Sequence, residues 1–302
     1  MNQEKITHDS DNSKTMHTIQ QLFAIIIIAS WLGAATAIED REQDLADKII
    51  EAEVTRRPIP VLSLRRPAMD VEMAYGIQRA YIERRLKKVS LAGFKAGLTA
   101  RKGQQRLGLD APVAGALLES GRVTTPIIES DGFRRPMVET EIGFIIGAPL
   151  TRPVKDASAL RDSIRAIAPV IELPDLGFAK TEHLAETDII AANACAKQFI
   201  VGPPQPVERV APNTTRVVLF LDGREINRGK GSEALGDQWQ AALWLVNTML
   251  AQGWRMEPGQ ILLTGALGKM LPAKPGKYRA DYGKLGEIRF EILPRNQRRG
   301  IE

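Results

Sequence analysis

From about Ser90 onward the sequence consists of short apolar runs, rich in β-branched residues and separated by glycine and proline. These runs are MVETEIGFIIG, IAPVIELPD, QFIVGPP, TRVVLFLDG, QILLTGAL and EIRFEILP. Many short strands with glycine turns predict a β core, built as a closed barrel or as a pair of sheets. One segment differs, because SEALGDQWQAALWLVNTMLAQG spaces Leu243, Val246 and Leu250 at helical intervals and ends at Gly253. It predicts a helix that interrupts the strands.

Residues 40 to 90 have a helical pattern instead. Leu45 and Ile49 recur at helical spacing before Pro58, and Met73 and Ile77 repeat the pattern in the next segment. We therefore predict a helical N-terminal part over residues 38–90 and a β-rich catalytic domain over residues 91–302. The chain has 302 residues and a single cysteine, so the core must form without an intrachain disulfide, as is usual at this size.

The first 37 residues form a separate element. An uncharged apolar run from Leu22 to Ala35 leads into Ala-Thr-Ala, which is the pattern of a signal peptide cleaved after Ala37. The run is shorter than the 20 or so residues that a membrane span needs, so we expect no permanent span. Translation could begin at Met1 or Met16. We expect export to the periplasm; an uncleaved anchor or a buried helix is the alternative, and the protein is cytoplasmic if the segment is not functional.

The net charge of +5 does not indicate a nucleic-acid partner. The densest basic runs are RRLKK, which begins at Arg84, and RNQRRG near the end of the chain, and neither is interleaved with aromatic residues. Such runs are typical of a solvated helix face and of a chain terminus. A positive surface can still help to attract a small anionic substrate.

Three glutamates lie in otherwise apolar strand segments. Glu139 and Glu141 are one residue apart in MVETEIGFIIG, so their side chains point to the same face of a strand, and Glu172 lies in APVIELPD. Alternating glutamates are common on solvated strand faces, but here Ile142 and Phe144 continue the apolar run. Half-buried carboxylates of like charge need a neutralising partner. Oxygen ligands without neighbouring histidine or cysteine suit Mg²⁺, Mn²⁺ or Ca²⁺ better than zinc.

Six segments carry a resemblance to a known family. They are GFKAGLTARKGQQRLGLDAPVAGAL, VETEIGFIIG, APVIELPD, ANACAKQFIVG, GKGSEALGDQWQAALWLVNTM and ILLTGALGKMLPAKPG, in this order. The chain resembles the 2-hydroxypenta-2,4-dienoate hydratases and the oxalocrotonate decarboxylases, within the fumarylacetoacetate hydrolase superfamily. The resemblance covers roughly residues 45–292. It implies an α+β fold with a mixed β core (a closed sheet or β-roll), a helical N-terminal part, and a homo-oligomer.

The resemblance also implies roles for single residues. Glu139, Glu141 and Glu172 match the ligands of Mg²⁺ or Mn²⁺, which would chelate the carboxylate and adjacent oxygen of a small 2-oxo or 2-hydroxy acid and stabilise an enolate. Lys95 matches the active-site lysine, which would hold the substrate and assist proton transfer.

The implied substrate pocket includes two further positions. Thr264, in LTGAL, matches a residue whose hydroxyl and neighbouring amides could bind the substrate carboxylate. Leu107, in QQRLG, matches a wall residue, although core packing explains it equally well.

The chain departs from the family pattern around these positions. Val113 stands where an acidic residue is usual, and Phe94 where an arginine usually precedes the lysine. Ala192 begins Ala-Asn-Ala-Cys in place of Asp-Asn-Ala-Ser, so Cys195 could offer the substrate a thiol instead of a hydroxyl; a small buried hydrophobe is the simpler interpretation. After the third glutamate, Gly177 ends Asp-Leu-Gly in place of Asp-Ser-Arg.

Four functions are therefore considered. The main hypothesis is a metal-dependent hydratase, a carbon–oxygen lyase, acting on a 2-hydroxydienoate or 2-oxo-enoate acid. A decarboxylase could use the same stabilised enolate. A C–C hydrolase of the acylpyruvate type would need a histidine to activate water, and after signal cleavage only His183 is left, in a polar stretch. The fourth is an exported binding protein that keeps the metal without catalysis.

Overall fold

The computed structural model describes residues 41–101, 104–105 and 111–295. The proposed signal segment, residues 1–37, and the predicted pocket residue Leu107 lie outside the described residues. From Leu45 onward the chain forms one compact unit. Among the described residues, none of the helices combines the length and apolar content that crossing a membrane requires.

The two longest helices with stated bounds begin at a capping aspartate. Residues 45–54 are helical. The Asp70 carboxylate accepts a hydrogen bond from the Met73 amide at 2.9 Å and so begins α2. Asp237 does the same for α6 by accepting from the second and third residues of that helix, and Gly253, with φ of +79°, follows its end. Further α-helices of the described residues are α2 (Val71–Leu86), α4 (Ala157–Arg161), α5 (Glu186–Ala191) and α6 (Gln238–Ala251).

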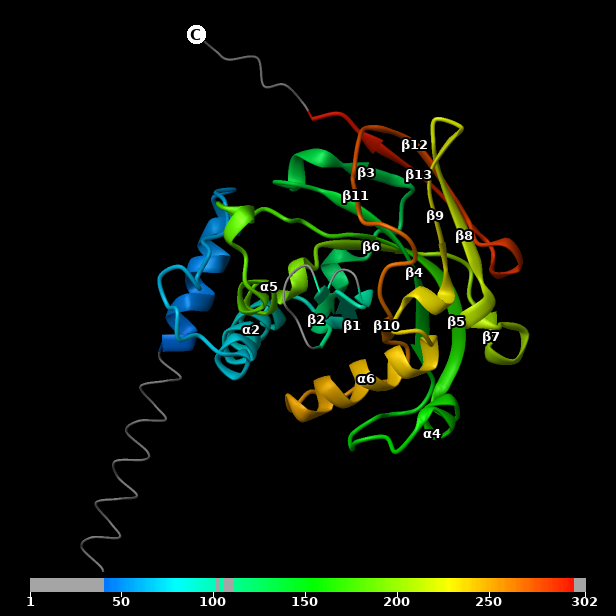
Figure 1. Cartoon of the computed structure of the whole chain (residues 1–302), viewed down its shortest axis with the longest axis horizontal. Helices are drawn as coiled ribbons and strands as arrows, with labels where there is room; N and C mark the ends of the chain where they lie inside the picture. Colours follow the sequence, from blue (N-terminus) through cyan, green and yellow to red (C-terminus); the bar gives the residue numbers. More distant parts are fainter. Residues whose placement is uncertain (1–40, 102–103, 106–110, 296–302) are drawn as a thin grey trace, which may run out of the picture. The chain divides into compact units, whose positions relative to one another are not determined.

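The strands of the described residues make up an eight-stranded and a five-stranded sheet (Figure 1). The first contains β2 (Val113–Leu118), β1 (Leu91–Gly97), β10 (Ile261–Leu263), β4 (Met137–Ile146), β5 (Ile164–Leu173) and β6 (Gln198–Val201) in that order, with β11 (Leu271–Pro272) paired to β4 and β7 (Gln205–Pro206) paired to β5. The second contains β3 (Ile127–Glu129), β13 (Glu287–Leu293), β12 (Gly276–Asp281), β8 (Arg216–Leu221) and β9 (Arg224–Lys230). Mixed sheets with helices beside them confirm the predicted α+β class.

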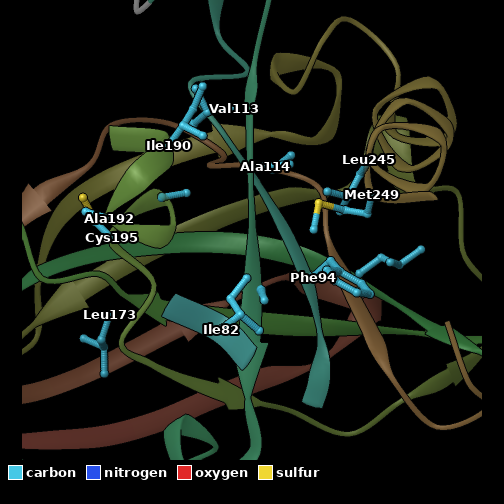
Figure 2. Packing of buried hydrophobic residues seen from close by; sticks show 14 of the residues in the cluster. Ile82, Phe94, Val113, Ala114, Leu173, Ile190, Ala192, Cys195, Leu245 and Met249 are labelled. Atoms are coloured by element: carbon cyan, nitrogen blue, oxygen red, sulfur yellow. The ribbon is translucent and has the colours of Figure 1, made fainter. Parts of the chain in front are cut away.

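The two faces of the eight-stranded sheet have different surroundings, as neighbouring residues of β1 show. Successive strand side chains alternate, so Phe94 and Lys95 point in opposite directions. Phe94 belongs to the buried cluster that also contains Met249 of α6 (Figure 2). The register places Lys95 opposite Leu263 of β10, and Leu263 opposite Gly143 of β4. The helix side of the sheet is therefore apolar core, and Lys95 points to the other side.

Close packing on this other side excludes side chains at particular positions. A β-carbon at Gly143 would lie 2.6 Å from Ile261 Cδ1 and 2.8 Å from Val170 Cγ2. At Gly93 it would lie 1.9 Å from the Ile261 carbonyl oxygen, so only glycine allows β1 and β10 to approach in this register. The apolar part of this face is filled by a second buried cluster, which contains Val170 and Ile261.

Candidate metal centre

Strand pairing brings the three glutamates together. Glu139 of β4 lies directly opposite Glu172 of β5, and Glu141 lies opposite Val170 two residues further along. Alternation puts all three carboxylates on the face that also carries Gly143. One carboxylate oxygen from each glutamate lies within 4.8 Å of the others. Glu141 and Glu172 are 1% and 0% exposed, and Glu139 lies at the partly exposed rim.

Lys95 reaches the same cluster from β1, two strands away from β4. Its Nζ lies 2.6 Å from Glu172 Oε1 and 3.3 Å from the carbonyl oxygen of Ala194. The ammonium group is buried, with only 4% of its side chain exposed. An ammonium has three N–H donors, and these two acceptors are the partners found among the described residues. One donor is therefore left over for a ligand.

The ionisation of the cluster shows that its negative charge is only partly compensated. Burial, together with the charge of Glu172, raises the pKa of Glu139 to about 7. Burial and the charges of Glu172 and Glu139 raise the pKa of Glu141 well above its ordinary value. Burial also disfavours the Lys95 ammonium, but the three glutamates together outweigh it and hold the pKa of Lys95 above its ordinary value.

The donor set fits a divalent cation. Three carboxylates and one ammonium carry a net charge of −2 when all are ionised. Among the described residues, no group donates a hydrogen bond to the fully buried Oε2 of Glu172, which is costly for a carboxylate oxygen. Three carboxylate oxygens without nitrogen or sulfur donors suit a hard cation such as Mg²⁺ or Mn²⁺. These residues can therefore hold the cation that the sequence predicts.

The TGALG segment follows β10 and fixes one carboxylate. The amide of Gly265 donates to Glu141 Oε2 at 2.9 Å, and the amide of Leu267 donates to the Thr140 carbonyl at 2.7 Å. Gly265 has φ of +108°, and a β-carbon there would lie 2.1 Å from Thr99 Oγ1. Glycine is therefore required where this segment runs along β4.

The structure places the other predicted pocket residues differently. The Thr264 hydroxyl lies 2.5 Å from Gln238 Oε1 and 3.1 Å from the Ile142 carbonyl, so it is engaged by α6 and β4. Cys195 belongs to the apolar cluster of Figure 2, and burial raises the pKa of its thiol to about 12. At neutral pH it is a protonated thiol, which is a weak donor and a poor nucleophile. Substrate contacts by either residue stay predictions.

Three departures from the family pattern have structural explanations. Phe94 lies on the helix side of β1, so it changes the core and not the Lys95 side. Val113 is buried in the same apolar cluster as Ile190 of α5 (Figure 2). A β-carbon at Gly177 would lie 2.5 Å from Nε of Arg134, whose side chain occupies the space.

Arg134 is one of several supporting residues that the sequence did not reveal. Its Nε lies 3.1 Å from Asp175 Oδ2, and its backbone amide donates to the same carboxylate. Tyr282, which follows β12 and is 2% exposed, donates its hydroxyl to the carbonyl of Val170, directly across from Glu141. Arg134 thus fastens the segment just before β4 to the segment just after β5, and Tyr282 holds β5 from a distant part of the chain. A tyrosine in a loop carries no spacing signal, so only the fold reveals it.

Asn193 also escaped the sequence analysis. It is 2% exposed, and its side-chain amide makes two hydrogen bonds to the backbone of Ala116 on β2, accepting at 2.7 Å and donating at 2.9 Å. Asn193 is the second residue of Ala-Asn-Ala-Cys, and no spacing pattern in the sequence connects it with Ala116.

His183 lies in a 3₁₀ turn, Thr181–His183, with 56% of its side chain exposed. Its imidazole lies 4.0 Å from the Glu182 carboxylate. His183 is therefore an exposed residue that does not belong to the carboxylate cluster, whereas a histidine that activates water would have to lie beside the bound substrate.

Comparison with known proteins identifies the family. Residues 112–293 match the family described as fumarylacetoacetate hydrolase, C-terminal. A 2-keto-4-pentenoate hydratase from Paraburkholderia xenovorans is 29% identical over 268 residues, which are 86% of this chain and 98% of that protein. The 2-keto-4-pentenoate hydratase 1 of Dechloromonas aromatica is 32% identical over 240 residues, which are 77% of this chain and 89% of that protein.

A solved structure has the same fold. It is the 4-oxalocrotonate decarboxylase from Pseudomonas putida G7 in complex with magnesium and adipate, which superimposes with a TM-score of 0.79 at 25% identity. The similarity covers 84% of this chain and 98% of that chain. The sequence segments, the fold and the carboxylate cluster agree, and the chain belongs to the fumarylacetoacetate hydrolase family.

Proposed function

We propose that the protein is a metal-dependent hydratase that adds water to a small 2-hydroxy-2,4-dienoate, the enol form of a 2-oxo-enoate. One observation carries the proposal: three clustered carboxylates, of which Glu141 and Glu172 are buried, face a lysine. Among the described residues, Oε2 of Glu172 accepts no hydrogen bond and the lysine keeps one donor free. The curated hydratases, which are about 30% identical over most of their length, support the same reaction class.

The glutamates hold the cation, and each is positioned by a different part of the fold. Glu172 is fixed by Lys95, Glu141 by the Gly265 amide, and Glu139 by its place opposite Glu172 on the neighbouring strand. When bound, a divalent cation supplies Lewis-acid stabilisation of negative charge on the substrate's carboxylate and 2-oxygen.

Lys95 supplies the remaining positive charge. Hydration of the dienoate removes the proton of the enol oxygen, places protons on two carbon atoms and adds hydroxide to the carbon between them, which gives a 4-hydroxy-2-oxo acid. Negative charge therefore moves onto the 2-oxygen and back during the reaction. A fixed ammonium with one N–H that no described residue accepts can hydrogen-bond that oxygen while the charge is greatest. Burial of the ammonium keeps competing water away and strengthens this interaction.

A decarboxylase is the second candidate, and the similarity to the oxalocrotonate decarboxylase structure favours it as the alternative. Loss of CO₂ from the distal carboxylate of an unsaturated 2-oxo diacid leaves electrons that move onto the 2-oxygen, where a cation and an ammonium would stabilise them. The two reactions differ in what they need: hydration adds water to a double bond, whereas decarboxylation needs a second carboxylate that can leave as CO₂.

An ultraviolet assay tests the proposal. The full chain, with Mg²⁺ or Mn²⁺, is mixed with 2-hydroxypenta-2,4-dienoate, and the loss of conjugated absorbance is followed while the product is identified by mass spectrometry. We expect a metal-dependent product heavier than the substrate by one water. Glu141→Gln should abolish turnover, whereas Glu119→Gln, at an exposed carboxylate, should not. Release of CO₂ from an oxalocrotonate, without hydration of the dienoate, would favour the decarboxylase.

We also propose two properties of the protein in its cell. The apolar run before Ala37 supports export with cleavage after that residue. The family resemblance supports a homo-oligomer, which analytical ultracentrifugation tests directly: a single monomeric species at micromolar concentration would contradict it.

A further inference from the structure

Three consecutive residues with side chains adopt left-handed backbone conformations beside the carboxylate cluster. Asn193, Ala194 and Cys195 have φ of 54°, 48° and 59°. Left-handed backbone is unfavourable for any residue with a β-carbon, and such residues normally occur singly. A run of three persists only where the surrounding structure holds it. We call residues 193–195 the left-handed turn.

The left-handed turn is fastened at both ends. The Asn193 side chain makes two hydrogen bonds to Ala116 of β2, at 2.7 and 2.9 Å. The carbonyl of Cys195 accepts from the amide of Asp175, two residues after the end of β5, at 3.0 Å. The turn therefore joins the edge strand β2 to the strand that carries the third glutamate.

The middle of the turn reaches Lys95. The carbonyl oxygen of Ala194 accepts from Lys95 Nζ at 3.3 Å. Gly115, the β2 residue directly opposite Lys95, makes room for this contact. A β-carbon there would lie 2.7 Å from the Asn193 carbonyl oxygen and 2.9 Å from the Ala194 β-carbon.

Satisfying the edge of β2 does not by itself explain the turn. Ala114, on the same edge, has its amide and carbonyl satisfied by the side chains of Tyr75 and Gln78 from the ordinary helix α2. An unstrained element can thus supply the missing partners of an edge strand. What the strained turn adds is a backbone carbonyl aimed at the Lys95 ammonium.

We propose that Asn193 is a positioning residue for Lys95: by anchoring the left-handed turn to Ala116, it holds the Ala194 carbonyl against the ammonium and so fixes where the spare N–H points. The two acceptors, Glu172 Oε1 and the Ala194 carbonyl, restrict the ammonium, and a loss of the second lets it rotate and shift. The inference rests on the proposed function, in which Lys95 hydrogen-bonds the substrate oxygen. Asn193 itself need not touch the substrate.

A double-mutant cycle with a matched control tests this role. Asn247 offers the control, because its side chain makes the same pair of hydrogen bonds to one backbone residue, Val154, at 2.8 and 2.9 Å, on the α6 side of the fold. Asn193→Ala should lower kcat by about tenfold or more while KM and the affinity for Mg²⁺ change by less than about threefold. Asn247→Ala should lower thermal stability similarly and leave kcat unchanged.

The cycle then asks whether Asn193 acts through the lysine. In a Lys95→Ala background, Asn193→Ala should lower kcat by less than about twofold, because its effect has already been removed. An equal decrease in both backgrounds, or a folded Asn193→Ala variant with wild-type kcat, would overturn the proposal. If Asn193→Ala does not fold, the near-isosteric Asn193→Asp keeps the acceptor, loses the donor, and should lower kcat in the same sense.

A crystal structure of Asn193→Ala provides a readout that does not depend on turnover. We expect the turn to relax and Lys95 Nζ to leave the Ala194 carbonyl. A preserved contact would overturn the proposal even if the wild-type protein hydrates the dienoate. If the wild type shows no hydration, the proposed function fails. The position of Lys95 in the crystal structure of Asn193→Ala still decides whether Asn193 positions the lysine.

Discussion

Replacing Glu139 with glutamine should stabilise the protein without metal and weaken its response to metal. Glutamine keeps the shape of the side chain but removes one of the crowded negative charges. Burial and Glu172 raise the pKa of Glu139 from 4.5 to about 7. The unfolded chain therefore loses this proton near pH 4.5 and the folded chain near pH 7, so the wild-type protein loses stability as the pH rises through this window.

The size of the effect follows from the shift. At about 1.4 kcal/mol per pKa unit, the wild-type protein loses about 3 kcal/mol above pH 7, which we reduce to about 2 because Glu139 is partly exposed. Bound metal should stabilise the wild type by about 2.7 kcal/mol at a concentration of 100 times Kd. The variant has lost a ligand, so its gain should be much smaller.

Urea unfolding at pH 8 and pH 5, with EDTA or with Mg²⁺, measures both effects. With EDTA at pH 8, Glu139→Gln should exceed the wild type by about 2 kcal/mol, and at pH 5 by less than about 1. Glu119→Gln, an exposed carboxylate, controls for the substitution itself. A variant less stable than the wild type in EDTA at pH 8, or equal stabilisation of both proteins by Mg²⁺, would refute the reasoning.

Three further predictions concern the lysine, the protons and the N-terminus. Lys95→Ala should lower kcat by about 10²–10³, with nearly unchanged Mg²⁺ affinity in calorimetry. Lys95→Arg should restore little activity, because a planar guanidinium cannot replace a compact ammonium. Turnover that survives Lys95→Ala would remove the residue from the mechanism. Mg²⁺ binding at pH 6.5 should release a proton, since Glu139 is then largely protonated without metal, and the Mg²⁺ affinity should fall as the pH drops below 7. Calorimetry in buffers of different ionisation enthalpy detects the released proton. Identical heats in all buffers would contradict this prediction. Protein recovered from its source cell should begin at Ile38 by N-terminal sequencing, whereas a soluble cytoplasmic protein that retains residues 1–37 would exclude export.

The strand and helix positions were predictable because local patterns determine them. The run MVETEIGFIIG, apart from its last residue, forms β4 (Met137–Ile146), and IAPVIELPD lies in β5 as far as Leu173. The helix predicted within SEALGDQWQAALWLVNTMLAQG is α6 (Gln238–Ala251), which begins six residues after the first residue of that segment. The spacing of apolar residues follows from side-chain alternation, and the ends of the elements follow from turn residues such as glycine and proline. Both depend only on residues near in the sequence. The division of the strands into two sheets depends on long-range pairing, so the sequence left a barrel and a pair of sheets open.

The carboxylates were found from their apolar surroundings, and their partners were not. Alternation places Glu139 and Glu141 on one face of β4. Which of these residues lies opposite Glu172 depends on the register between β4 and β5, and local sequence patterns do not specify that register. Asn193 and Tyr282 act through hydrogen bonds to the backbones of residues far away in the sequence. Such contacts have no spacing signal, which is why only the fold reveals them.

The central claim is that the three glutamates hold one divalent cation, and a crystal structure of the full chain grown with Mn²⁺ tests it most directly. Anomalous scattering should show a single Mn²⁺ bound by carboxylate oxygens from Glu139, Glu141 and Glu172, with Lys95 still beside Glu172. No anomalous peak at this cluster in saturating Mn²⁺, or a peak bound by other residues only, would contradict the account.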